Sequence, residues 1–123
     1  MLTLFPLSDK TETEKIYLEK GFEFCENSGC LLCKEGENVL GLCLYELTKE
    51  KMSVNYIEPE TDIALADGIL RSTLHVAAEN GVMKAFYGDN IAELCRKLCF
   101  IKNAEEKRLD IDKLFRSCQS CNS

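Results

Sequence analysis

The chain has 123 residues, 21 of them acidic and 15 basic, and its formal net charge at pH 7 is -6. This length fits one domain with one sizeable core. The acidic balance and the lack of a basic stripe argue against nucleic acid and anionic membranes as partners. No apolar run approaches the roughly 20 residues of a membrane span. The N-terminus lacks the cationic start of a signal peptide, so we expect a cytoplasmic protein.

The N-terminal part of the chain predicts a strand followed by a helix. Residues 2–7 are mostly apolar and form the expected first strand. Ser8 has the side chain of a helix N-cap, and Gly21 is placed to end the helix. Ile16 and Leu18 are the apolar residues that we expect this first helix to turn inward.

Three antiparallel strands are predicted next. A turn at 26–29 precedes a short apolar run at 30–33, and the polar loop 34–38 predicts a hairpin. The stretch 39–47 is nearly continuously apolar, which is typical of a strand buried on both faces. Residues 52–57 alternate apolar and polar side chains, the period of a half-buried strand.

A long helix follows, which Thr61 or Asp62 can cap and which Gly81 ends. Its apolar residues recur at helical spacing and predict one inward face. That face comprises Ala66, Ile69, Leu70, Thr73 and Ala77.

The C-terminal part predicts shorter elements. A strand at 82–87 precedes a short helix at 89–98, and 100–101 begins another extended segment. Residues 109–114 predict a last strand or turn, and 116–123 form a polar tail that contains two cysteines.

The predicted order of elements is β-α-β-β-β-α-β-α-β, within one domain at 1–115. Helical crossovers impose parallel pairing on the later strands. We therefore expect an α+β fold, with a central mixed sheet of about six to seven strands flanked by helices on both faces.

This order resembles the GNAT (Gcn5-related N-acetyltransferase) fold. The family's core runs strand, Pro, small-residue turn, helix, Gly, strand, short helix and Leu-Gly-Phe. The positions that carry the resemblance are Pro59, Ala64, Ala66, Gly81 and Leu98-Cys99-Phe100. The resemblance implies transfer of an acetyl group from acetyl-CoA to the amine of a small molecule or peptide, by direct attack in a ternary complex, in a monomer or homodimer.

The resemblance also implies roles for individual residues. The backbone of the fourth strand would hold the pantetheine arm, at Val54, Asn55, Tyr56 and Ile57. The turn and first helical residues would face the pyrophosphate, at Thr61, Ala64, Leu65, Ala66 and Asp67. Asn90 would open the short helix beside the cofactor, Glu58 would be the general base and Cys95 the general acid.

The predicted pyrophosphate turn departs from the family pattern, Gln/Arg-x-x-Gly-x-Gly/Ala. Thr61 replaces a long donor, and Ala64 narrows the approach of phosphate to the backbone. Glu60, Asp62 and Asp67 each either favour the helix dipole or repel a phosphate by roughly 1 kcal/mol. An alternative function is therefore a GNAT-fold binding module without catalysis.

The eight cysteines are expected to be mostly reduced core residues. Cys30 and Cys33 lie three apart on a predicted strand, so they point to opposite faces, and we expect no metal site. Cys118 and Cys121 leave a metal or redox protein as a second alternative. The single histidine, His75, lies opposite the inward helix face and supports no catalytic dyad.

Overall fold

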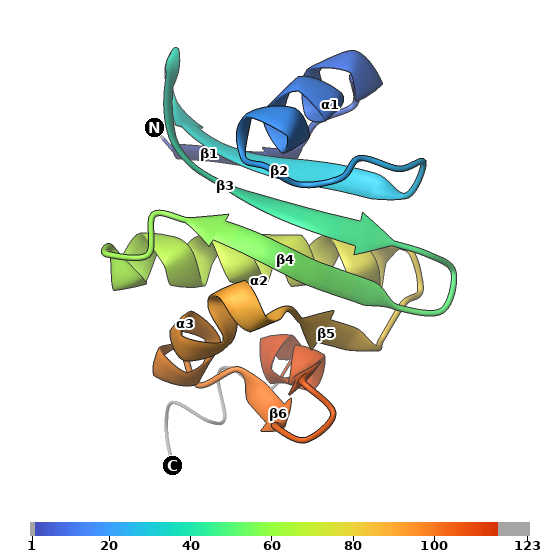
Figure 1. Ribbon diagram of the computed structural model, residues 1–123. Coiled ribbons are helices and arrows are strands. Elements are labelled where there is room, and N and C mark those ends of the chain that lie inside the picture. Colours follow the sequence, from blue (N-terminus) through green and yellow to red (C-terminus); the bar gives the residue numbers. More distant parts are fainter. Residues whose placement is uncertain (1, 116–123) are drawn as a thin grey trace.

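The computed structural model describes residues 2–115, and seven strands in that range form one sheet in the order β1-β2-β3-β4-β5-β7-β6. Helix α1 lies on one face of this sheet and α2 on the other (Figure 1). The strands are β1 Leu2–Pro6, β2 Ser28–Glu35, β3 Asn38–Leu47, β4 Met52–Glu58, β5 Ala85–Tyr87, β6 Ile101–Asn103 and β7 Arg108–Leu109. The helices are α1 Lys10–Glu19, α2 Ile63–Glu79 and α3 Ala92–Lys97, with 3-10 turns η1 Asp89–Ile91 and η2 Ile111–Phe115. The predicted α+β class and mixed sheet are confirmed.

Strand direction differs in part from the prediction. Among the described strands, only β4 and β5 pair in parallel, joined by the crossover helix α2. The short helix α3 was expected to impose a second parallel pair, and this was wrong. It leads to β6 at the edge of the sheet, and β7 inserts between β5 and β6, antiparallel to both. None of the helices within residues 2–115 is long and apolar enough to cross a membrane.

Strands β2 and β5 also begin at other residues than predicted, because the hydrogen bonds that end the preceding turns lie elsewhere. Ser28 and Gly29 belong to β2, since the Ser28 N–H already closes a turn on the Cys25 carbonyl at 3.1 Å. Strand β5 starts only at Ala85, because the Val82 N–H is bonded to the end of α2, at the Ala77 carbonyl.

Strand β3 is buried on both faces only in its middle. Residues 41–45 are buried, as the apolar stretch predicted. Val39 and Leu40 are 53% and 38% exposed, so the prediction was wrong for the start of the strand. These residues lie within three positions of the hairpin turn at Gly36-Glu37, which is exposed to solvent.

Helix α1 is capped by Asp9 and not by Ser8. The Asp9 carboxylate accepts hydrogen bonds from the Thr11 and Glu12 N–H groups, at 2.9 and 3.3 Å. Satisfying these free donors is the physical role of an N-cap. The helix therefore starts one residue later than predicted.

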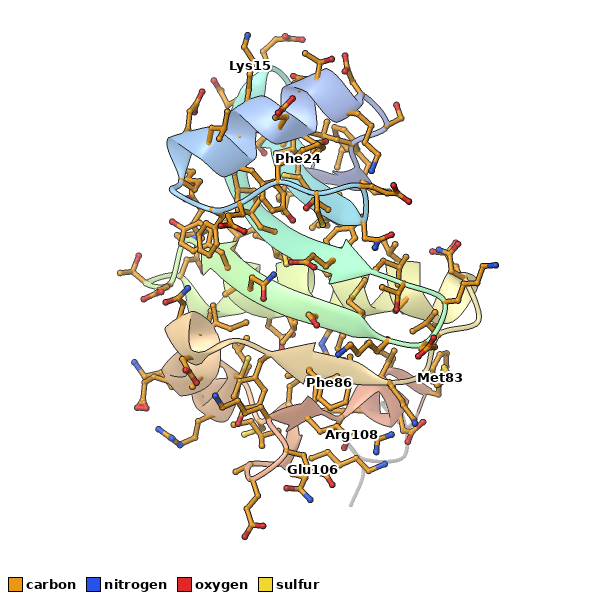
Figure 2. The ribbon with its side chains drawn as sticks, turned by 45° about the vertical axis from the view of Figure 1, so that its right-hand side comes forward. Lys15, Phe24, Met83, Phe86, Glu106 and Arg108 are labelled. Atoms are coloured by element: carbon orange, nitrogen blue, oxygen red, sulfur yellow. The ribbon has the colours of Figure 1, made fainter. Side chains whose placement is uncertain are left out.

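The inward face of α1 is built around Tyr17. Its ring is buried, and its hydroxyl donates to the Tyr45 carbonyl at 2.6 Å. Phe24 lies beneath the helix with its ring edge-on to Tyr17, at 5.7 Å between centroids (Figure 2). The predicted inward pair is only partly correct, since Ile16 is half-buried but Leu18 is 65% exposed. Leu18 follows Tyr17 directly, and one residue turns the side chain by about 100° around the helix.

Helix α2 packs on the opposite face of the sheet with the predicted side chains. All five residues of its expected inward face are buried, and Leu74 joins them. The apolar members of this face belong to one core with buried side chains of β2, β3, β4 and α3. This core fixes α2 against the sheet, and therefore fixes where the N-terminus of α2 lies relative to the end of β4.

The three helices end in the same way, on a left-handed residue. Gly21 and Gly81 end α1 and α2 as predicted, with φ of 81° and 76°. Cys99 follows α3 with φ of 61°. There the Phe100 N–H bonds to the Cys95 carbonyl and the Cys99 N–H to that of Arg96, the pattern of a Schellman motif. Cys99 therefore occupies the glycine position of the family's Leu-Gly-Phe.

Replacing Cys99 by glycine is expected to stabilise the protein. The left-handed conformation costs a non-glycine residue about 1 kcal/mol, and the exposed Cys99 side chain contributes little packing. We expect Cys99→Gly to raise the free energy of unfolding by about 0.5–1 kcal/mol, measured by urea denaturation. Cys99→Ala removes the same thiol but keeps the strain, so it should show no gain. A gain in both variants would contradict this account.

Candidate functional site

Strands β4 and β5 separate after a short parallel ladder. They pair from Met52 to Val54, and the Gly88 N–H then donates to the Val54 carbonyl at 2.9 Å. At this point the chain leaves β5 for η1, while β4 continues to Glu58. Within residues 2–115, the β5-side edge of β4 therefore has no strand partner beyond Val54.

A β-bulge marks the start of this opening. On the β3 side, Val54 pairs with Tyr45 and Tyr56 with Leu44, so Asn55 is an extra residue in β4. Such a bulge bends a strand and increases its twist. It separates the paired part of β4 from the part that diverges from β5.

The predicted pantetheine-binding residues lie at or beyond this bulge. The Val54 and Ile57 side chains are fully buried in the core, so only their backbone groups can meet a ligand. Asn55 is half-buried beside Gly88, where a Cβ added to the glycine would lie 3.5 Å from the Asn55 Oδ1. Asn90 is exposed in η1, which follows Gly88 directly.

Glu58, the predicted base, is held by two donors at the end of β4. Its Oε1 accepts a hydrogen bond from the Tyr56 hydroxyl at 2.6 Å and lies 2.8 Å from the Lys20 Nζ. Partial burial raises the pKa of Glu58, but the bonds from Lys20 and Tyr56 outweigh it and hold the pKa below its ordinary value. The hydrogen bond to Glu58 raises the pKa of Tyr56 to about 12.

A pocket of about 370 Å³ opens beside Glu58, between α1 and the sheet. Its volume is within the range of small-ligand sites. Apolar side chains form part of its lining, and three carboxylates and two lysines complete it. The lining residues are Glu12, Ile16, Glu19, Lys20, Leu32, Lys34, Val39, Leu42 and Glu58.

The N-terminus of α2 follows β4 after a four-residue turn. Asp62 is the N-cap, and its carboxylate accepts the Leu65 N–H at 3.1 Å. The Ala66 N–H bonds to the Asp62 carbonyl at 2.9 Å, and Ala66 is fully buried. Ala64 lies exposed in the first turn of the helix, and Thr61 lies exposed in the preceding turn.

These contacts test how a CoA molecule fits the site. The open edge of β4 fits an amide-bearing pantetheine arm, because unpaired backbone groups seek hydrogen-bond partners. The helix N-terminus fits a pyrophosphate poorly, because the Asp62 carboxylate takes the Leu65 N–H and places a negative charge beside the remaining donors of the first turn. Asp67, also predicted to face the pyrophosphate, is instead paired with Arg71 at 2.7 Å along the helix.

Cys95, the predicted acid, is a fully buried residue of α3. It belongs to the core formed with α2 and the sheet. Burial raises the pKa of the Cys95 thiol to about 12. No contact in the described residues joins it to Glu58, which lies on the face of β4 that bears Tyr56.

The remaining predicted features of the cysteines and histidine can be placed. Cys30 and Cys33 belong to the separate cores on the two faces of the sheet, as expected, and both are free thiols. Within residues 2–115, no group of three or more His, Cys, Asp or Glu side chains is placed to hold a metal ion. Cys118 and Cys121 lie outside the described residues, and His75 is exposed as predicted.

Two residues of the site were missed by sequence reasoning. Gly88 closes the β4–β5 ladder, and a glycine directly after a predicted strand is a signal that could have indicated it. Lys20 binds Glu58 from the end of α1. No local pattern could have indicated this pair, because it joins distant parts of the chain.

The sequence matches no family model and no curated protein. Solved structures are similar in fold. The ribosomal-protein-S18-alanine N-acetyltransferase from Escherichia coli matches with a TM-score of 0.57 at 12% identity, covering 88% of each chain. An aminoglycoside acetyltransferase from an uncultured soil metagenomic sample, in complex with sisomicin, matches with a TM-score of 0.57 at 11% identity, covering 84% of this chain and 88% of that one.

A third similar structure contains a ligand. It is the solution structure of a provisionally assigned N-acetyltransferase from E. coli bound to coenzyme A, with a TM-score of 0.51 at 17% identity, covering 80% of this chain and 84% of that one. The structure of a GNAT-family acetyltransferase from Streptococcus pneumoniae also matches, with a TM-score of 0.55 at 14% identity. The match covers 82% of this chain and 88% of that one. With this strand order, these matches show that the chain has the fold of the GNAT acetyltransferases.

Proposed function

We propose that the protein is an N-acetyltransferase, which moves an acetyl group from acetyl-CoA to the amine of a small molecule or peptide. The observation that supports this best is the open edge of β4 beyond Val54. An extended ligand with amide groups can add to such an edge as a further strand does. The pantetheine arm of CoA is a ligand of this kind, and the backbone from Asn55 to Glu58 would hold it.

Acetyl-CoA, when bound, supplies an acetyl thioester. Glu58 accepts the proton that the acceptor amine loses as the new C–N bond forms and the C–S bond breaks. A glutamate is ordinarily ionised at neutral pH, which is the form that a base requires, and the lowered pKa of Glu58 favours that form further. The pocket beside Glu58 is the proposed acceptor site, and its other carboxylates, Glu12 and Glu19, favour a cationic amine.

The departing thiolate receives its proton from solvent in this proposal, and not from Cys95. An ordinary thiol has a pKa near 8.5. Burial raises that of Cys95 to about 12, so this thiol holds its proton more tightly than a free thiol does. Cys95 is therefore assigned to packing of α3 against the core.

Calorimetry with acetyl-CoA and amide mapping by NMR test the proposed site. We expect binding heat and shifts of the amides of residues 55–58 and Gly88. No heat and no thermal shift at saturating ligand would contradict the proposed donor. Turnover is then measured as free thiol released with a panel of amines, from polyamines to peptides.

A side chain at position 88 is expected to close the site. A Cβ there would make ordinary contacts, at 3.5 and 3.7 Å from Asn55 atoms, so Gly88→Val leaves the fold intact. Its methyl groups extend into the opening beside β4. We expect the affinity for acetyl-CoA to fall at least ~10-fold, which is ~1.4 kcal/mol, with little change in melting temperature. Gly68→Ala, where an added Cβ meets open space, is the control and should keep the affinity. Unchanged binding in Gly88→Val would place the ligand elsewhere.

A second candidate function is a GNAT-fold module that binds a ligand without catalysis. The observation that favours it is the Asp62 carboxylate at the N-terminus of α2, which opposes tight CoA binding. Binding without release of thiol across the amine panel would support this function. Turnover on any amine would exclude it.

A further inference from the structure

The segment from β4 into α2 is strongly acidic. Between Met52 and Leu70 the sequence contains four acidic residues and no basic residue. Glu60 and Asp62 are both exposed, Glu60 in the turn and Asp62 at the N-cap of the helix. Two of the four, Glu58 and Asp67, are paired with Lys20 and Arg71 outside the segment. The like charge that an anionic ligand would meet at this end of β4 therefore comes from Glu60 and Asp62.

The Asp62 carboxylate places one of these negative charges directly at the N-terminus of α2. An anion at a helix N-terminus is held by the free N–H groups of the first turn and by the helix dipole. The Asp62 carboxylate already takes the Leu65 N–H at 3.1 Å, and the next donor, that of Ala66, is used within the helix. The protein thus supplies its own anion where the diphosphate of a nucleotide would have to bind.

We infer that Asp62 is a specificity-determining residue that excludes the pyrophosphate from this terminus. The donor is then selected by its pantetheine arm and its acyl group, and the nucleotide part contributes nothing to affinity. The substrate class is the S-acyl pantetheine thioesters, with or without a nucleotide. The pantetheine half of this inference rests on the proposed function, whereas the exclusion by Asp62 does not.

Titration calorimetry with three probes tests the selection of the donor. Pantetheine, 4′-phosphopantetheine and CoA carry the same arm and increasing negative charge. We expect wild-type affinities that agree within about threefold across the series, which corresponds to ~0.6 kcal/mol. CoA bound more than ~30-fold tighter than pantetheine, or ~2 kcal/mol, would overturn the inference.

Asp62→Asn isolates the charge, because asparagine caps a helix as well as aspartate does. We expect this variant to bind CoA and 4′-phosphopantetheine about 5- to 30-fold more tightly than wild type, with pantetheine unchanged. Asp9→Asn is the matched control. It removes the same charge from the N-cap of α1, and should leave all three affinities as they are. An equal gain in both variants would overturn the role of Asp62.

Inorganic pyrophosphate tests the helix terminus without the arm. In Asp62→Asn we expect saturable NMR shifts of the Ile63 and Ala64 amides, which are free of the cap. Wild type and Asp9→Asn should show none. Shifts in wild type, or none in Asp62→Asn, would overturn the exclusion. If pyrophosphate behaves as expected but pantetheine does not bind, the exclusion by Asp62 stands and the proposed donor site fails.

Discussion

Glu58→Gln is expected to lower kcat/KM for acetyl transfer by at least ~100-fold, the lower end of the contribution of a positioned general base. The glutamine keeps the size of the side chain but cannot accept the proton of the amine. The measurement uses the amine with the highest turnover in the panel. Glu60→Gln, an exposed carboxylate two residues away, is the control and should keep its rate. Equal rates for Glu58→Gln and wild type would remove Glu58 from the mechanism.

Lys20 gives this test a readout that simple misfolding would not change. Activity requires ionised Glu58, so the rate falls as the pH drops through its pKa. Lys20 lowers that pKa. Lys20→Met should therefore raise it and move the acid limb of the pH–rate profile to higher pH. Lys15 is exposed on the outer surface of α1 (Figure 2), and Lys15→Met should leave the limb in place. A limb that stays fixed in Lys20→Met would show that another group titrates.

Gly41→Ala is expected to destabilise the protein by about 3 kcal/mol, a large part of the stability of a small domain. A Cβ on Gly41 would lie 2.5 Å from the Glu58 carbonyl oxygen, 2.7 Å from Ile69 Cδ1 and 2.9 Å from Pro59 Cδ. The nearest atom belongs to the backbone, so the end of β4 would have to move. The change should appear as a lower urea midpoint, and as weaker binding of acetyl-CoA because the site is displaced.

Gly68 provides the matched control for this prediction. It lies inside α2, and a Cβ there would have no neighbour within 4 Å. Gly68→Ala should therefore stabilise the protein by about 0.5–1 kcal/mol through the higher helix propensity of alanine. If Gly41→Ala unfolded at the same urea concentration as wild type, the close approach of β3 to Glu58 and Pro59 would be contradicted.

The long helix shows where sequence reasoning succeeds. The predicted inward face of α2 and its end at Gly81 agree with the structure, and of the two candidate caps, Thr61 and Asp62, the cap is Asp62. Each depends on residues within a few positions of one another, where helical periodicity and capping chemistry act. Helix α1 was harder, because its inward residue is Tyr17, which a search for aliphatic residues passes over.

The candidate site shows where such reasoning ends. The sequence predicted that β4 holds the ligand, but not that its β5-side edge opens where Gly88 closes the ladder and η1 replaces the continuation of β5. Cys95 matched a family position by spacing, and the packing of α3 buries it. Whether a side chain is available to a ligand depends on which elements cover it, and spacing does not contain that information.

The sequence by itself determined the α+β class, the order of the helices, the glycine ends of α1 and α2, and the resemblance to the GNAT fold, because these follow from local periodicity, capping and turn chemistry. The tertiary structure decided the chemical state of the site. It joined Lys20 to Glu58, turned the Asp62 carboxylate onto the first turn of α2, and enclosed Cys95. The effect of a charge depends on its distance from other charges and from water, and for residues far apart in the chain only the folded structure sets those distances.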